Sequence, residues 1–458
     1  MIFLSLLLAV LGSSVSLAAP TTSAQNATVD ALVYALPLSP YVIVANSMSV
    51  ASASNDFATN TFVHVTALAN ASSRTVILPN TDTLYSAALL DLSAGDVVVT
   101  MPERELGRFY VLPFYDLYGN NVCSIGTVTS SMAGKYLIQY RPSNAGCDLI
   151  PDASDGYAGT ISLPTVYGQI LLRIEVFNST DVDHIVSTIQ PHFRLTSLLN
   201  TPSSGAPPLT SALLNDGLAV DNPPLHLLQL LSRLASFNPA EEASDAEHVA
   251  TTLEAAGISV SSESYTPPAG VDLASAYTTA LNLVQQVPLN PANLLPLSSD
   301  SLWSTTLPSL SGDFHTRYDL RAYTSISNAL AAGSRMCQGD FGLWLTVYDG
   351  EGFLVPNAVD RYSLGDRADL TYPDGTPVYN GKGNGAGGDA KAFYMLLQST
   401  DVEVAAEWEA NWLPTPADGA KFSFILRFYG PTLSLTDGTY EYPKITAVDA
   451  NPPLPISE

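Results

Sequence analysis

The chain has 458 residues, which is enough for two or three domains that each bury a core. Its 43 acidic and 18 basic residues leave a net charge of −25, although only 13% of the residues are charged. Because such a surface repels phosphate groups, the charge balance argues against nucleic acid as a partner and against binding to an anionic membrane surface.

The first 18 residues have the pattern of a secretory signal peptide. An apolar run at residues 2–11 is too short to span a bilayer, and small residues follow at 16–18, where a signal peptidase would cut. No later segment is predicted to be apolar for long enough to form a membrane helix. N-glycosylation sequons begin at three positions, Asn26, Asn70 and Asn178. We therefore expect a secreted, soluble glycoprotein without a membrane span.

A helical lead-in is expected after the signal, at residues 19–56. This segment is mostly apolar, and Pro37 and Pro40 inside it predict a break in the helix. Residues 57–180 then alternate short apolar runs with turn clusters. That alternation is typical of an antiparallel β-sandwich.

Residues 181–336 change to helical spacing and predict a helical insert between two β domains. The expected helices lie at 224–237, 244–257, 272–287 and 313–332. The helix at 244–257 should open with a capping box at 244–247. The apolar stripes of the insert are expected to pack against the β domains rather than to form a surface for a partner.

The three cysteines allow three pairings and leave one thiol over. Cys123 and Cys147 lie on either side of a predicted strand at 135–140, within the same β domain, and are the preferred disulfide pair. Cys337 is expected to stay reduced and buried as a small apolar residue, because no motif places a base near it.

Polar residues occur at strand ends in the segment 76–126, which is the most informative stretch of the chain. They are Asn80, Asp82, Tyr85, Arg108, Tyr115, Asp116 and Asn120. A β scaffold can direct side chains at such positions into a cleft, although Asn and Asp also occur there for their turn chemistry. Asp82, Asp116 and Tyr85 are the candidate catalytic residues.

Arginine accounts for 13 of the 18 cations. Since a buried charge without a partner is costly, we expect arginine beside the least hydrated carboxylates. The hypothesis is one polar ligand pocket at the junction of the two β domains. Its members would be Asn80, Asp82, Tyr85 and Asp116, together with Arg321 and with Arg361 or Arg427. The alternative is an interdomain ion-pair network that binds no ligand.

Common catalytic motifs are absent from the sequence: it has no G-x-S-x-G, no H-E-x-x-H and no C-x-x-C. The six histidines do not occur at metal-ligand spacings, so no metal site is predicted, although one assembled from distant segments stays open. Glycines in the run at 383–388 match the dinucleotide pattern literally. Because no strand and helix flank that run, we predict a loop and no cofactor.

Strands are expected again at 337–450, where a β-prone run at 341–348 ends in an Asp-Gly turn. This part contains WLTVYDGEGFLVPNAVDRYSLGDR, DGTPVY, NWLPTP, LRFYGP and DGTYEYP, and the first β domain contains PNTDTLYSAALLDLS, GRFYVLPFYDLYGN and SIG. In this order the motifs closely resemble the two-domain family of domain of unknown function 1254 and domain of unknown function 1214. The resemblance covers about residues 30–448.

The resemblance implies a mainly β protein with a helical insert, and it brings no settled activity. The expected architecture is an N-terminal immunoglobulin-like β-sandwich, a central α-helical segment and a C-terminal jelly roll. Two functions stay open: an enzyme that acts on a small organic molecule or glycan in an interdomain cleft, and a noncatalytic extracellular protein that binds a ligand or another surface. Strongly shifted carboxylate pKa values in the cleft would favour the enzyme.

Overall fold

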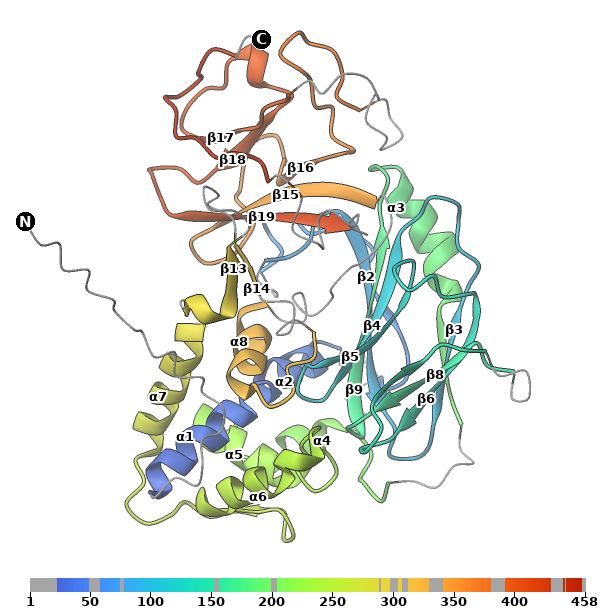
Figure 1. The fold of residues 1–458 in the computed structure, drawn as a ribbon, viewed down its shortest axis with the longest axis vertical. Helices are drawn as coiled ribbons and strands as arrows, with labels where there is room; N and C mark the ends of the chain where they lie inside the picture. The colour runs from blue at the N-terminus through green and yellow to red at the C-terminus, as the bar shows by residue number, and fades with distance from the viewer. Residues whose placement is uncertain are drawn as a thin grey trace, which may run out of the picture.

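The computed structural model describes residues 23–48, 58–74, 78–151, 156–198, 204–287, 290–296, 304–306, 312–328, 341–379, 392–429, 440 and 442–454. Figure 1 shows three parts: the sandwich of the first β domain at the right, the helices at the lower left and the smaller C-terminal β region at the top. The first domain and the helices share one continuous apolar core, and the C-terminal region has a smaller core of its own.

Two helices precede the first sheet, α1 (Ala24–Ala35) and α2 (Leu38–Ser47). The break between them at Pro37 confirms the predicted interruption. Together they form an apolar run that is long enough to cross a membrane, so the prediction that no segment after residue 18 is long and apolar enough is wrong, although 72% of the most apolar window of this run is buried inside the protein. Helices that are buried to this extent belong to the core of a protein. In agreement with this, α1 contacts helices α5, α6, α7 and α8.

The first domain consists of two five-stranded sheets. The first sheet has the order β1 (Val63–His64), β2 (Thr83–Asp91), β9 (Tyr167–Glu175), β4 (Tyr110–Asp116) and β5 (Asn121–Gly126). The second has the order β10 (Arg194–Ser197), β3 (Val97–Met101), β6 (Gly134–Tyr140), β8 (Gly159–Leu163) and β7 (Gly146–Asp148). Apolar residues between the sheets, such as Leu84, Ile138 and Ile174, are fully buried and form the core.

Two details differ from the predicted antiparallel sandwich of residues 57–180. Strands β6 and β8 run parallel, because β7 lies between them in the chain and takes the antiparallel position beside β8. Strand β10 pairs along its whole length with β3, so the sandwich continues into the segment that helical spacing had assigned to the insert. A four-residue edge strand has too few residues for its periodicity to be recognised.

A disulfide joins Cys123 in β5 to Cys147 in β7 and so links the two sheets. Its Cα atoms are 5.7 Å apart, within the usual range for a disulfide. The structure confirms this preferred pair. Cys337 lies outside the described residues.

The middle of the chain is mainly helical. Its helices are α3 (Asp181–His184), the π-helix η1 (Ile185–Ile189), the 3₁₀ turn η2 (Gln190–His192), α4 (Ser211–Asn215), α5 (Pro223–Leu234), the 3₁₀ turn η3 (Ala243–Asp245), α6 (Ala246–Ala255), α7 (Leu273–Gln286), the 3₁₀ turn η5 (Pro291–Asn293) and α8 (Tyr318–Asn328). Two short hairpins interrupt them, β11 (Ile258–Ser259) with β12 (Ser264–Tyr265) and β13 (Leu294–Pro296) with β14 (Ser304–Thr306).

Helices α5, α6, α7 and α8 lie close to their predicted positions, and α5 and α7 bury their apolar faces against the rest of the core. The predicted capping box at 244–247 is wrong. The helix begins after the turn η3, and its N-cap residue Asp245 makes no side-chain capping bond. Asp245 instead accepts a hydrogen bond from the hydroxyl of Tyr318 at 2.6 Å, which takes the carboxylate away from the helix end.

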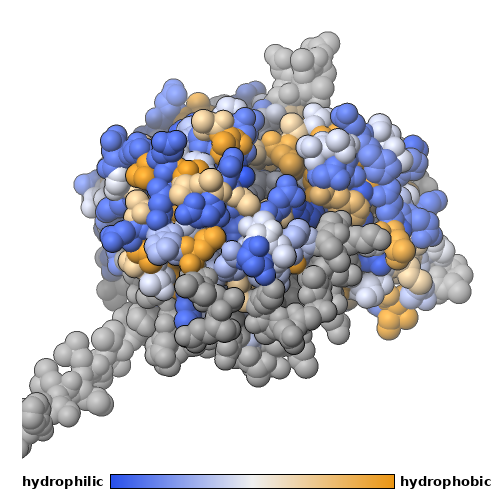
Figure 2. All heavy atoms as spheres, turned by 90° about the horizontal axis from the view of Figure 1, so that it is seen from above, coloured by the Kyte–Doolittle hydropathy of each residue, from blue (hydrophilic) through white to orange (hydrophobic). Residues whose placement is uncertain are grey.

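The C-terminal region contains an antiparallel sheet of β16 (Ser363–Gly365), β15 (Phe341–Asp349) and β19 (Phe422–Tyr429). The parallel pair β17 (Leu396–Ser399) and β18 (Trp412–Thr415) and the turn η7 (Ala406–Trp408) complete its regular structure among the described residues. Mainly β with helices is therefore the fold class. Figure 2 shows polar and apolar residues interspersed over the upper face of the molecule.

Candidate functional site at the domain junction

Residues 78–82 connect the first domain directly to the C-terminal region. The backbone N–H of Leu78 donates to the carbonyl of Gly352 at 2.7 Å, and the hydroxyl of Tyr348 donates to the carbonyl of Pro79 at 2.9 Å. The Thr81 hydroxyl donates to that of Ser363 at 2.8 Å. This segment therefore forms part of the contact between the first domain and the C-terminal region.

Asn80 and Asp82 form a turn at the start of β2. The side-chain oxygen of Asn80 accepts a hydrogen bond from the backbone N–H of Asp82 at 2.8 Å, which is the turn chemistry that Asn favours. Asp82 is only 1% exposed, and its carbonyl accepts from the N–H of Val176 after β9. Both predicted residues thus lie in the junction, held against the ends of β2 and β9.

Tyr85 and Arg173 lie opposite each other in the register of β2 and β9, so their side chains leave the same face of the sheet. The Arg173 guanidinium carbon is 5.7 Å from the centre of the Tyr85 ring. Tyr115 of β4 belongs to the same group: burial raises the pKa of its hydroxyl, and the nearby positive charge of Arg173 opposes that rise. One face of the first sheet therefore carries a cation among tyrosines.

The C-terminal sheet presents a matching face because successive residues of β15 point to opposite sides. Leu345 and Val347 pack into the C-terminal core. Trp344 and Tyr348 point the other way, toward the first domain, where Trp344 packs against Phe109 and Val111 and Tyr348 bonds Pro79.

Arg427 of β19 joins this second face. Its guanidinium donates to the Leu78 carbonyl at 3.2 Å and to the Thr346 hydroxyl at 3.3 Å, and its carbon lies 5.7 Å from the centre of the Tyr348 ring. Burial raises the pKa of Tyr348, the charge of Arg427 opposes this, and Tyr85 raises the pKa further. Tyr85 and Arg427 therefore both act on Tyr348 from opposite domains.

Several buried polar atoms at the junction make no hydrogen bond within the described part of the chain. They include the hydroxyl of Thr83, the indole N–H of Trp344 and the Nε–H of Arg367. Buried polar groups in proteins nearly always have a partner, so such atoms at one junction indicate a place that a polar ligand or water would complete. Thr83 is on the same face of β2 as Tyr85.

An ion pair also joins the two domains at this junction. Arg367 of the C-terminal region contacts Glu175 at the end of β9, and its guanidinium lies 4.8 Å from the Trp344 ring. Glu175 also accepts from the N–H of Phe109 at 2.8 Å. Burial raises the pKa of Glu175, and Arg367 is the main group that opposes the rise.

Asp116 and Arg321 lie elsewhere. Asp116, 2% exposed, accepts hydrogen bonds from the N–H groups of Tyr118 and Asn120 at 2.9 and 2.8 Å and from the Asn120 amide at 2.7 Å. Arg321, 1% exposed, lies among three tyrosine rings, with centres 4.5 to 4.7 Å from its guanidinium carbon. Those rings belong to Tyr34, Tyr118 and Tyr318. Burial raises the pKa of Asp116, and Arg321 is the strongest opposing charge.

Glu241 belongs to this second cluster and has the most informative carboxyl group there. Its pKa is raised to about 9, first by burial and then by the neighbouring charges of Asp116 and Asp313. One of its oxygens is buried and makes no hydrogen bond within the described residues. No sequence motif surrounds Glu241, and this residue was not among the predicted site residues.

The prediction of a single pocket is therefore wrong in one respect, because the residues predicted to form it lie at opposite ends of β9. Thr83, next to Asp82, pairs with Glu175, whereas Asp116 pairs with Gly168. Seven residues along a strand correspond to about 23 Å. Arg361 is also outside the junction, because its guanidinium donates to carbonyls of the C-terminal region itself, those of Glu409 and Trp412.

The junction thus unites Asn80, Asp82, Tyr85 and Arg427 of the predicted set. Sequence reasoning missed Thr83, Arg173, Trp344, Tyr348 and Arg367. Arg173 had a recognisable signal, because it is the single charge within the otherwise apolar run of residues 170–174. No spacing connects it with Tyr348, since the two come together only when the two domains pack.

The sequon asparagines are all exposed. Asn70 and Asn178 lie in turns where the side-chain oxygen accepts from the hydroxyl two residues later, Ser72 and Thr180, at 2.6 Å in both cases. Asn26 lies in the first turn of α1. Among the described residues, no three His, Cys, Asp or Glu side chains are grouped so that they would hold a metal ion.

The fold and the junction define a class of protein in which a helical region lies between two β regions in the chain and the two β regions share a polar contact. The chain belongs to the family with both members of a pair, Protein of unknown function (DUF1254) at residues 59–197 and Protein of unknown function (DUF1214) at residues 341–433. Among curated proteins, none matches the chain.

A comparison with solved structures supports the overall fold through one protein. The VPA0106 protein from Vibrio parahaemolyticus is 16% identical, with a TM-score of 0.52, over 92% of this chain and all of that one. An uncharacterised protein from Burkholderia cenocepacia is 11% identical, with a TM-score of 0.33, over 86% of this chain and 83% of that one. The likeness to the Vibrio protein is one of overall fold.

Proposed function

We propose that this is a secreted glycoprotein that binds a small organic molecule or glycan at the junction of its two β domains. The observation that carries the proposal is that Tyr85 and Arg173 from one domain meet Tyr348 and Arg427 from the other. Residues from both domains would then contact the same ligand, which is a common position for a ligand site.

The chemistry of the junction favours a ring-containing ligand with a carboxylate. Arginine binds carboxylates in a bidentate manner, and tyrosine rings stack on sugars and other rings. The Thr83 hydroxyl and the Trp344 indole N–H would supply the remaining hydrogen bonds. An acidic sugar such as glucuronate combines these features.

Binding without turnover is the function we place first. The carboxyl with the largest shift, that of Glu241, lies in the other cluster, and Glu175 at the junction is already paired with Arg367. Should the junction carry catalysis, Asp82 and Tyr85 are the residues positioned for it, and Asp116 is not.

The same proposal includes the finer fold, an immunoglobulin-like N-terminal sandwich and a C-terminal jelly roll. The two five-stranded sheets and the antiparallel β15 sheet support it.

The binding proposal is tested by thermal shift with glucuronate and, for comparison, neutral methyl glucoside. A ligand that binds only the native state raises the melting temperature, and the stabilisation grows with the logarithm of the ligand concentration relative to Kd. Glucuronate should stabilise the wild type, and Arg427→Gln and Tyr85→Phe should lose that effect. Arg141→Gln, an exposed arginine of the sandwich, is the matched control. No shift with either sugar, or an equal loss in the control, would count against the junction as this site.

Secretion and glycosylation are tested on protein recovered from the medium of a eukaryotic host. The mature chain should begin at or near Ala19 and carry glycan on Asn70 or Asn178. Intact mass before and after enzymatic deglycosylation measures this directly. A mass that does not change would remove the glycan from the proposal.

A further inference from the structure

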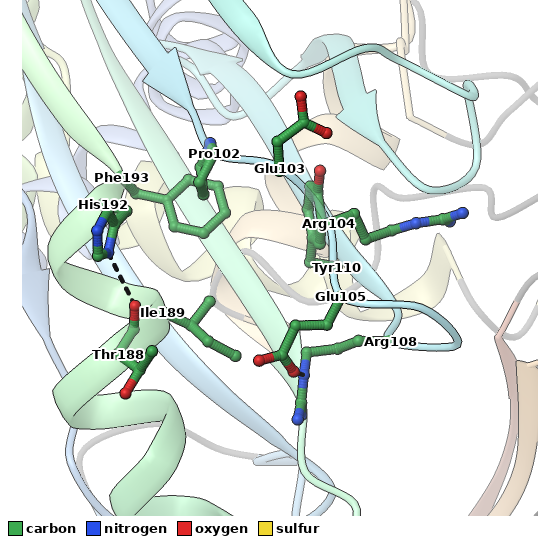
Figure 3. Close-up of a pocket in the computed structure, with 10 residues that line it drawn as sticks. All are labelled: Pro102, Glu103, Arg104, Glu105, Arg108, Tyr110, Thr188, Ile189, His192 and Phe193. Atoms are coloured by element: carbon green, nitrogen blue, oxygen red, sulfur yellow. Dashed lines mark hydrogen bonds and ion pairs between the residues drawn. The ribbon is translucent and has the colours of Figure 1, made fainter.

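A pocket of about 260 Å³ lies on the first domain, and its lining residue Arg108 donates to the carbonyl of Glu175 at the edge of the domain junction. One wall is the irregular helical run from α3 to η2, and the other is the connection from β3 to β4 at residues 102–108 (Figure 3). Its floor consists of Tyr110, Phe193, Ile189 and Pro102. The rings of Tyr110 and Phe193 pack edge to face with centres 5.6 Å apart. The pocket is therefore lined with ring and aliphatic surface at its base.

The helical wall has an unusual backbone. It changes within twelve residues from α-helix to the π-helix η1 and then to the 3₁₀ turn η2. π-Helical turns are rare and often occur at functional sites. The π-helix includes Thr188 and Ile189, which both line the pocket, while Ile185 at its start is fully buried and fixes the helix to the core.

Arg108 ties the two walls together. Its guanidinium donates to Glu105 at 2.8 Å on one wall and to both oxygens of Asp181, at 2.8 and 2.9 Å, at the start of the other. It also donates to the Glu175 carbonyl and lies 4.1 Å from the centre of the Phe177 ring. Because these bonds between protein groups fix the two walls relative to each other, the pocket is preformed, which lowers the entropic cost of binding.

Glu105 is a polar group that faces the interior of the pocket. In Figure 3 its carboxylate points toward Ile189, whereas the Arg104 guanidinium and the Glu103 carboxylate point away from Ile189 and Phe193. Burial alone would raise the pKa of Glu105, but hydrogen bonds from His184 and Arg108 hold it below the ordinary value. Each carboxylate oxygen already accepts one bond and has room for another. Glu105 is thus an anionic acceptor at the edge of an apolar floor.

We propose that this pocket binds a small uncharged ring compound that carries a hydroxyl group, such as a phenol, with the hydroxyl donating to Glu105. An anionic ligand would be repelled by the like charge of the Glu105 carboxylate. A monosaccharide would leave several hydroxyls without partners against the floor of Tyr110, Phe193 and Ile189. The volume suits one ring with a small substituent.

The test uses 4-methylphenol, 4-methylbenzoate and methyl glucoside as probes of the full mature chain in ligand-observed NMR. Ile189→Trp should fill the pocket and abolish the 4-methylphenol signal. The matched control is Ser187→Trp on the same helix, where the exposed hydroxyl bonds the Asp183 carbonyl and does not line the pocket. Circular dichroism confirms that both variants are folded.

Glu105→Gln keeps the shape of the acceptor and removes its charge. Because charge-assisted hydrogen bonds are about twice as strong as neutral ones, 4-methylphenol should bind roughly fivefold more weakly. Three results would overturn the proposal: no binding of 4-methylphenol to the wild type, equal loss in Ser187→Trp, or binding of 4-methylbenzoate or methyl glucoside that Ile189→Trp removes. Arg427→Gln should leave 4-methylphenol binding unchanged, which separates this pocket from the junction.

Discussion

The two ends of strand β9 use the same residue types in opposite ways. At the junction end, Arg173 and Arg427 lie beside tyrosines from two domains, and the contacts run across the domain boundary. At the far end, Arg321 lies within the continuous core, enclosed by three tyrosines and next to Asp116.

The difference teaches that an arginine among tyrosines is not by itself a ligand site. The cage around Arg321 brings together rings from α1, α8 and the turn after β4, all parts of a single core. A charge buried there stabilises the packing of those elements only because its partners are present. At the junction two domains meet, and polar atoms of Thr83 and Trp344 make no bond within the described residues. We therefore expect the cluster around Arg321 to govern stability and the residues of the domain junction to govern binding.

Replacement of the buried cation should have the largest effect. Arg321→Met leaves Asp116 buried without its cation and should lower the free energy of unfolding by about 3–5 kcal/mol. Arg427→Met removes two hydrogen bonds to oxygen atoms at a half-buried position and should cost only about 1–2 kcal/mol. Urea unfolding at pH 7 measures both. Equal losses would mean that the two ends of β9 do not differ in this way.

Removal of the disulfide should come next. Replacing Cys123 and Cys147 together by alanine should cost about 3 kcal/mol, since the cross-link closes a short loop in the unfolded chain. The bond joins the two sheets of the sandwich and contacts neither cluster, so binding of glucuronate to the folded protein should not change. Chemical denaturation gives the stability. A change below about 1 kcal/mol would contradict the prediction.

The pH dependence of stability should report on the far cluster. The pKa of Glu241 is about 9 in the folded protein and 4.5 in its ordinary state. Between these values the unfolded chain has lost the proton that the folded protein retains, so the free energy of unfolding falls as pH rises through this window. Below about pH 4.5 both states are protonated and this contribution is constant.

Glu241→Gln removes this titration and should therefore gain stability relative to the wild type as pH rises from 5 to 8.5. Urea melts of both proteins at three pH values measure the difference. Glu242→Gln, whose carboxyl group contacts the exposed His315, is the neighbouring control. A constant difference between Glu241→Gln and the wild type at all three pH values would remove Glu241 from the cluster.

The smallest effect should come from a single bond across the junction. Tyr348→Phe removes the hydrogen bond to the Pro79 carbonyl and should cost about 1 kcal/mol. Because that bond joins two domains, the variant should also broaden the thermal transition as the domains begin to unfold separately. Calorimetry detects both changes. A sharp transition at the wild-type temperature would show that Tyr348 does not hold the domains together.

Much of the architecture was predictable because its signals are local. Apolar runs and turn residues indicated the strands of the first domain, leucine spacing located α5, and two cysteines flanking one strand indicated the disulfide. Edge strand β10 was not predicted, since four residues carry too little periodicity. The capping box predicted at 244–247 fails for a different reason: the helix begins one residue later, and the carboxylate of its N-cap residue Asp245 accepts a hydrogen bond from Tyr318 instead of capping the helix.

The sequence by itself determined that polar residues stand at predicted strand ends, which marked Asn80, Asp82 and Tyr85 as candidates, and that cations are few, which marked Arg427. Only the tertiary structure decided which of them meet. Strand register places Asp116 at the opposite end of β9 from Asp82, and domain packing places Tyr348 beside Pro79. The physical reason is that a strand extends about 3.3 Å per residue, so residues that look equivalent at strand ends are separated by the whole length of the sheet.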